Sequence, residues 1–181
     1  MRKSDPLASF ALLALAVGCG TASAQSHTFG VGRTPTEDDQ RRLGIMVAPD
    51  GTGLPAGSGT AATGKQLFAT RCASCHGATG DGADGPPLVG GKGTLATAKP
   101  KKTVGSYWPY ATTLWDYINR AMPFNQPGTL SYDEVYALTA YVLYLNEIVP
   151  ETHALNARTL PRIRMPNRDG FIADPRPDVS R

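Results

Sequence analysis

The sequence has few cysteines, no long hydrophobic run and little net charge. Of its three cysteines, two lie too close together in sequence to close a long disulfide loop. The longest apolar stretch, residues 7–17, contains a serine and falls short of the roughly 20 residues of a membrane span, which argues against an uncleaved transmembrane anchor. Lysine and arginine exceed acidic residues by three and form no basic block. Nucleic acid is therefore not an implied partner.

Residues 1–24 have the layout of a secretory signal peptide. A short basic start precedes the apolar stretch, and the small residues Ala-Ser-Ala at positions 22–24 are those that signal peptidase prefers. The pattern predicts cleavage after Ala24 and a periplasmic location for the mature protein. A rival site is the AVGC string at residues 16–19, which loosely resembles a lipoprotein box. Lipidation of Cys19 there would anchor the chain to a membrane.

Composition separates a central domain, residues 57–150, from two extensions. Residues 25–56 contain turn-forming sequence without apolar periodicity, which predicts an extended N-terminal segment. Residues 151–181 are polar and contain four prolines, which predicts an extended C-terminal segment. This C-terminal segment also contains apolar residues that should pack on the domain or on a partner: Leu160, Ile163, Met165, Phe171 and Ile172.

The central domain is predicted to be helical, because no strand signal matches its helical periodicity. A first helix is expected over residues 63–72, with Thr63 as its N-cap, and a second over residues 109–121. The third should begin at Ser131, whose spacing to Glu134 fits a capping box.

The string Cys72-Ala73-Ser74-Cys75-His76 is a C-x-x-C-H motif, which is typical of covalent heme attachment. Its two thiols can add to the two vinyl groups on one edge of the porphyrin, and His76 then supplies the proximal nitrogen. A structural zinc site would need a second pair of ligands, and the chain has no second cysteine pair. A thioredoxin-like dithiol would need a βαβ context, which the helical pattern does not offer. We therefore expect one covalently bound heme c.

The sixth iron ligand must come from another part of the chain. Met122 precedes Pro123 at the end of the second predicted helix, where the chain can turn the thioether toward the iron. Met165, which also precedes a proline, is the second candidate. The alternative for either residue is an ordinary core methionine. Ligation by His and Met raises the reduction potential of the iron relative to ligation by nitrogen atoms alone, which suits an electron acceptor.

Further residues are expected beside the heme. A metal-bound histidine normally donates its other ring N–H to a carbonyl, and the Pro86 carbonyl is the candidate acceptor for His76. The alternative is that residues 85–88 form a simple turn. Four side chains are candidates for contact with the heme propionates: Lys102, Tyr107, Trp108 and Arg120.

Taken together, these motifs resemble the class I, mitochondrial-like cytochrome c domain. The matching strings are CASCH at residues 72–76, GPPL at residues 85–88 and RAMP at residues 120–123. The resemblance covers about residues 57–150 and implies an all-α fold in which three to four helices enclose heme c. It also implies that His76 and Met122 are the axial ligands.

Longer strings resemble the cytochrome subunits of periplasmic sulfite dehydrogenases and of the related sulfur dehydrogenase. They include residues 102–118, 120–131, 133–141 and 165–171, and the match reaches into both extensions. The resemblance implies a non-catalytic subunit that accepts electrons from a molybdenum-containing catalytic subunit. It would pass them to another cytochrome or to an oxidase. With a single C-x-x-C-H motif, the chain resembles the one-heme version.

Two other functions stay open at this point. The first is a free-standing cytochrome c, soluble or lipid-anchored, that serves a terminal oxidase or another dehydrogenase. The second is a binding or sensor heme protein with an open iron site. A neighbouring molybdopterin oxidoreductase gene would favour the dehydrogenase subunit, and optical detection of methionine ligation would argue against the sensor.

Overall fold

The computed structural model describes residues 32–172, without the side chains of residues 41–43. The chain divides into two units, Met1–Thr34 and Pro35–Arg181, and the elements described below belong to the second. The predicted signal peptide, its cleavage site after Ala24 and the alternative lipidation site Cys19 lie outside the described residues. Within residues 32–172, no helix has the length and apolar character to cross a membrane.

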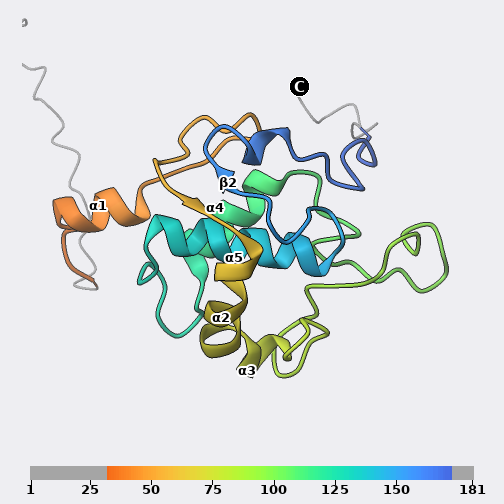
Figure 1. The fold of residues 1–181 in the computed structure, drawn as a ribbon. Coiled ribbons are helices and arrows are strands. Elements are labelled where there is room, and N and C mark those ends of the chain that lie inside the picture. Colours follow the sequence, from red (N-terminus) through yellow and green to blue (C-terminus); the bar gives the residue numbers. More distant parts are fainter. Residues whose placement is uncertain (1–31, 173–181) are drawn as a thin grey trace, which may run out of the picture. The chain divides into compact units, whose positions relative to one another are not determined.

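The predicted all-α fold is confirmed as a mostly helical one, to which the structure adds two short strands (Figure 1). In chain order, its elements are α1 (Glu37–Leu43), β1 (Ser58–Gly59), α2 (Ala61–Arg71), α3 (Ala73–His76), α4 (Ala111–Ala121), α5 (Tyr132–Leu145), β2 (Leu155–Asn156) and the 3-10 helix η2 (Leu160–Arg162). The long stretch between α3 and α4 consists of turns and loops. The strands β1 and β2, which the sequence did not indicate, form a two-residue antiparallel pair.

Capping explains where the helices begin. Thr60, and not the predicted Thr63, is the N-cap of α2, and Thr63 is the N3 residue that completes its capping box. α4 begins at Ala111 rather than at residue 109. Ser131 caps α5 and forms the predicted capping box with Glu134. A capping box satisfies two orphan N–H groups at once, which fixes the first turn of both α2 and α5.

The N-terminal segment, predicted to be extended throughout, contains the short helix α1. Thr36 is its N-cap and forms a capping box with Asp39. The first turn carries three acidic residues, which interact favourably with the positive end of the helix dipole. Because these signals are polar and local, an apolar pattern could not reveal the helix.

α5 is the central helix, and residues 135–143 are buried on all of its sides. α2 crosses α5 closely, with the rings of Phe68 and Tyr141 5.2 Å apart. At the crossing, Gly64 lies directly on the backbone of Ala137, where a Cβ atom would overlap the Ala137 carbonyl. This glycine therefore lets the helix that leads into the C-x-x-C-H motif approach the centre of the core.

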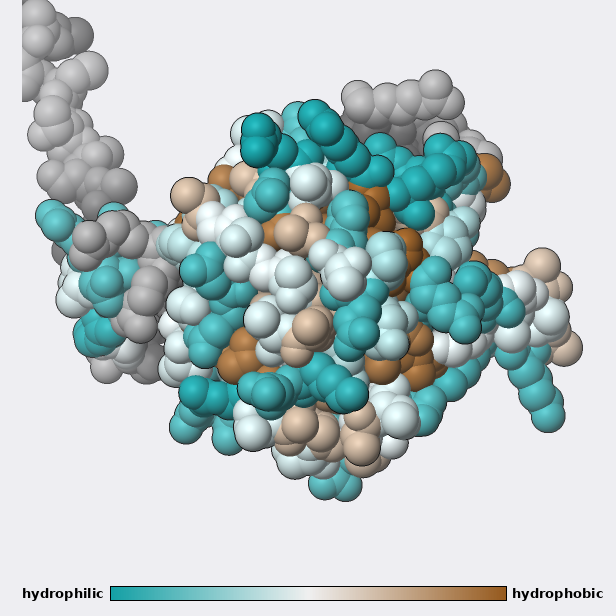
Figure 2. Space-filling model, viewed as in Figure 1, coloured by the Kyte–Doolittle hydropathy of each residue, from teal (hydrophilic) through white to brown (hydrophobic). Residues whose placement is uncertain are grey.

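The two flanking segments pack on this helical core. β1 pairs with β2 through Gly59 and Leu155, which joins the N-terminal side of α2 to the C-terminal segment. Leu155, Leu160 and Met165 are 0%, 0% and 1% exposed. The C-terminal segment therefore contributes to the core, whereas Phe171 and Ile172, which were also expected to pack, are 51% and 91% exposed. On the face drawn in Figure 2, the hydrophobic residues that reach the surface form small, separate patches among hydrophilic ones.

Candidate heme site

A cavity of about 810 Å³ lies beside α4 and α5. This volume falls in the range of roughly 300–1,000 Å³ that is usual for ligand and cofactor sites. Side chains of Cys72, Cys75, His76 and Met122 all line it. Much of the remaining wall is apolar and comes from Phe68, Val104, Leu114, Ile118, Leu130, Leu138 and Val142.

The C-x-x-C-H motif occupies the junction between α2 and α3. Cys72 is the C-cap of α2, and one turn of α3 follows, in which the His76 N–H donates to the Cys72 carbonyl at 2.9 Å. The thiols of Cys72 and Cys75 are free. Burial raises the pKa of the Cys72 thiol to about 11, the neighbouring Cys75 adds to this, and Arg71 opposes it. The short helical turn thus brings two cysteines and a histidine to the same cavity.

The ring of His76 is held by the carbonyl predicted for it. His76 Nδ1 lies 2.8 Å from the Pro86 oxygen, and since a carbonyl can only accept, Nδ1 carries the hydrogen. Nε2 is then the nitrogen with a free lone pair for a metal. A Cβ on Gly85 would be 3.1 Å from the Cys75 carbonyl oxygen and 3.3 Å from His76 Cε1. Glycine at this position leaves room for the loop to approach the histidine.

Met122 brings the end of α4 to the cavity. The helix ends at Ala121, and Met122 has extended backbone, with φ −123° and ψ 149°. Its half-buried side chain lines the cavity. Met165, the second candidate, is 1% exposed within the hydrophobic core and is not among the lining residues. Met46 is 74% exposed, so among the methionines of residues 32–172 only Met122 lines the cavity.

The four candidates for propionate contact divide into two pairs. Lys102 and Trp108 line the cavity. Tyr107 does not: its ring lies under the Lys102 ammonium, at 5.0 Å, and its carbonyl accepts from Asn167 Nδ2 at 2.7 Å. Arg120 does not line the cavity either, because its guanidinium points to a different group of acceptors.

Polar residues that the sequence did not single out hold two loops of the cavity wall. Thr103 Oγ1 donates to the Gly90 carbonyl at 2.7 Å, and the Thr103 N–H donates to Ser106 Oγ at 2.9 Å. Asn146 Nδ2 donates to the Leu88 carbonyl at 3.2 Å, which ties the loop after Pro86 to the end of α5. The spacing of Thr103 and Ser106 is compatible with a hydroxyl-stabilised turn, but nothing local indicates the two distant carbonyls.

The residues present fit a heme better than a structural metal ion. Within residues 32–172, no three His, Cys, Asp or Glu side chains gather as a metal site would require. The cavity instead combines two thiols, one imidazole and one thioether with a largely apolar wall. This is the donor set for covalent attachment of a porphyrin and for axial ligation of its iron.

Comparison with known proteins gives a consistent result. The sequence model of the family described as "Cytochrome c" matches residues 61–146. The thiosulfate dehydrogenase of Psychrobacter arcticus is 34% identical over 110 residues, which cover 55% of this chain and 31% of that protein. This chain thus spans about a third of that relative's length.

Among solved structures, a chain of the sulfane dehydrogenase SoxCD from Paracoccus pantotrophus superimposes with a TM-score of 0.75. It is 44% identical, and the match covers 83% of this chain and 75% of the other. Members of the cytochrome c family carry covalently bound heme c, in agreement with the C-x-x-C-H motif at the junction of α2 and α3. On this similarity and on the family match, the chain belongs to the cytochrome c family.

Proposed function

We propose that this chain is a periplasmic one-heme cytochrome c that accepts single electrons from the catalytic subunit of a dehydrogenase for sulfite or a related sulfur compound. The 44% identity to a chain of the SoxCD sulfane dehydrogenase carries the proposal. That match covers 83% of this chain, so it extends beyond residues 61–146 into the flanking segments. A likeness that includes these segments is more than the likeness of one heme domain to another. The signal-peptide pattern of residues 1–24 supports the periplasmic assignment.

Each residue of the site has a separate role in this proposal. Cys72 and Cys75 attach one heme c through thioether bonds, and His76 and Met122 are the axial ligands. Bound heme supplies a one-electron iron couple. The Pro86 carbonyl fixes the orientation of the His76 ring through the 2.8 Å contact with Nδ1. Methionine ligation and the apolar wall both favour a high reduction potential, as an electron acceptor requires.

The oxidation of the sulfur compound is assigned to a different subunit. By the resemblance described above, that subunit contains molybdenum, and the electron leaves this cytochrome for another cytochrome or an oxidase. The similarity to thiosulfate dehydrogenase covers 31% of that enzyme and therefore supports the cytochrome part alone. In this proposal the chain transfers electrons and is not itself an enzyme.

The test uses the full chain with its heme attached, together with the molybdenum oxidoreductase that the proposal expects a neighbouring gene to encode. We expect the two to co-elute in size-exclusion chromatography. We also expect anaerobic addition of sulfite or thiosulfate to reduce the heme, as followed by absorbance. The matched control is the Cys72→Ser/Cys75→Ser chain, which lacks attached heme and should give no such signal. A cytochrome that dithionite reduces, but that neither binds the oxidoreductase nor accepts its electrons, would refute the proposal in favour of a free-standing carrier.

A further inference from the structure

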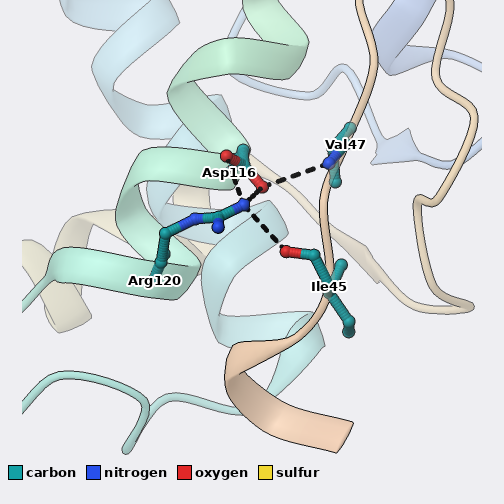
Figure 3. Close-up of polar contacts among 4 residues, drawn as sticks. All are labelled: Ile45, Val47, Asp116 and Arg120. Carbon is teal, nitrogen blue, oxygen red and sulfur yellow. Dashed lines mark hydrogen bonds and ion pairs between the residues drawn. The ribbon is translucent and has the colours of Figure 1, made fainter. Parts of the chain in front are cut away.

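Asp116 and Arg120 join α4 to the N-terminal segment in a polar cluster that we call the clasp (Figure 3). Arg120 Nη2 donates to both carboxylate oxygens of Asp116, at 2.7 and 2.9 Å, and to the Ile45 carbonyl at 2.8 Å. The Val47 N–H donates to Asp116 Oδ1 at 3.2 Å. The two side chains therefore bind each other and the backbone of one distant segment.

The clasp lies on the side of α4 that faces away from the cavity. Asp116 and Arg120 are four residues apart and share one face of the helix. Leu114 and Ile118 are displaced from them by two residues, which places them on roughly the opposite face, and both line the cavity. The N-terminal segment thus holds α4 from behind the wall that α4 contributes to the site.

Arg120 also lies next to the proposed axial ligand in the chain. It belongs to the last turn of α4, and Met122 is the first residue beyond the helix. The Met122 N–H donates to the Ile118 carbonyl at 3.1 Å, so the position of Met122 depends on that last turn. Terminal helical turns open easily unless other contacts hold them.

We propose that the clasp is a positioning device for Met122, which keeps its thioether at the cavity by holding the last turn of α4 to the N-terminal segment. This inference rests on the proposed role of Met122 as an iron ligand. Neither Arg120 nor Asp116 lines the cavity, so in this proposal they act through Met122. The partly buried position of the pair, with side chains 39% and 22% exposed, protects it from full solvent screening.

The competing explanation is that the pair is an ordinary helix salt bridge. Such i,i+4 pairs stabilise a helix slightly, without any specific effect on the residue that follows it. The two explanations differ in one measurable respect. A positioning device changes the strength of the methionine–iron bond in the folded protein, whereas an ordinary salt bridge changes only the stability of the fold.

The experiment titrates imidazole into the full-length ferric holoprotein and follows loss of the long-wavelength absorption band of methionine-ligated heme. We expect Arg120→Ala and Asp116→Asn to lose the band at an imidazole concentration about tenfold lower than the wild type requires. A tenfold change is what the loss of hydrogen bonds to a charged group should produce. Arg120→Lys, which keeps the charge but not the planar fork, should lie between them and the wild type. Far-UV circular dichroism checks that each variant is folded. If Arg120→Ala does not fold, Arg120→Lys and Asp116→Asn decide the result.

Two controls separate the possible failures. Lys92→Ala removes an exposed ion pair with Glu147, 3.7 Å long, in which neither residue belongs to α4 or lines the cavity, and should titrate like the wild type. If the clasp variants also titrate like the wild type, the positioning role is wrong. Met122→Ala should lack the band from the start. If Met122→Ala retains it, the axial assignment fails first, and the clasp inference fails with it.

Discussion

The crossing of α2 and α5 allows a clear prediction for Gly64. Helix propensity and packing there predict opposite changes in stability when glycine is replaced by alanine. In an exposed helix, replacing glycine by alanine stabilises by about 1 kcal/mol. Here the added Cβ would overlap the carbonyl group of Ala137 and crowd Cβ of Tyr141. Backbone atoms of a central helix cannot move aside cheaply, so the upper part of the overpacking range applies, about 3 kcal/mol. The net expectation for Gly64→Ala is a loss of about 2 kcal/mol.

Thermal unfolding of the ferric holoprotein, followed by circular dichroism, measures this effect. A loss of this size lowers the Tm of a chain of this length by about 4–8 °C. The control is Ala69→Gly, at an exposed position of the same helix, which should cost about 1 kcal/mol through propensity alone. A Gly64→Ala variant that is more stable than the wild type would refute the close crossing. It would also refute the placement of the C-x-x-C-H motif that depends on it.

The remaining predictions concern the methionines and one buried tyrosine. Met122→Ala should lose the long-wavelength band of the ferric protein, whereas Met165→Ala should keep the band and lose about 2–5 kcal/mol of stability, because Met165 is 1% exposed; the reverse pattern would make Met165 the ligand. Burial raises the pKa of Tyr136 to about 12, so an unfolded chain releases this proton at lower pH than the folded one. The resulting stability is complete below pH 10 and is lost as the pH rises toward 12. Tyr136→Phe should therefore lose Tm less steeply than the wild type over this interval, although at neutral pH it loses the 2.9 Å hydrogen bond to Pro55, worth about 1 kcal/mol. Equal slopes for the two proteins would contradict the assignment.

Local signals in the sequence were sufficient to predict the elements that carry the site. The capping box of Ser131 and Glu134 marks the start of α5. The proline after Met122 marks the end of α4 and thus a place where a side chain can leave the helix direction. The spacing of the C-x-x-C-H motif brings its two cysteines and its histidine together at the junction of α2 and α3. Each of these features depends on residues close in sequence, which is why pattern analysis reaches them.

Long-range polar contacts could not be predicted in the same way. The spacing of Asp116 and Arg120 is a visible i,i+4 pair, but it indicates only a helix salt bridge. Their second partners are backbone groups of Ile45 and Val47, about 70 residues away in sequence. A backbone carbonyl has no sequence signature, so the structure was needed to recognise the clasp. The same limit explains why Arg120 was a reasonable candidate for the propionates and yet binds elsewhere.

The flanking segments show that a polar, proline-rich composition does not mean that a segment is separate from the folded domain. A small domain buries a smaller fraction of its surface than a large one does, so buried residues contributed from outside the domain add to its stability. The C-terminal segment supplies such residues and also contacts the neighbours in sequence of one cavity-lining residue. Asn167 donates to the Tyr107 carbonyl, and Arg168 lies 4.2 Å from the ring centre of Tyr110. These two tyrosines flank Trp108, which lines the cavity. Since the N-terminal segment holds α4 through the clasp, both flanking segments are bound to parts of the chain that line the cavity, and neither is an independent tail.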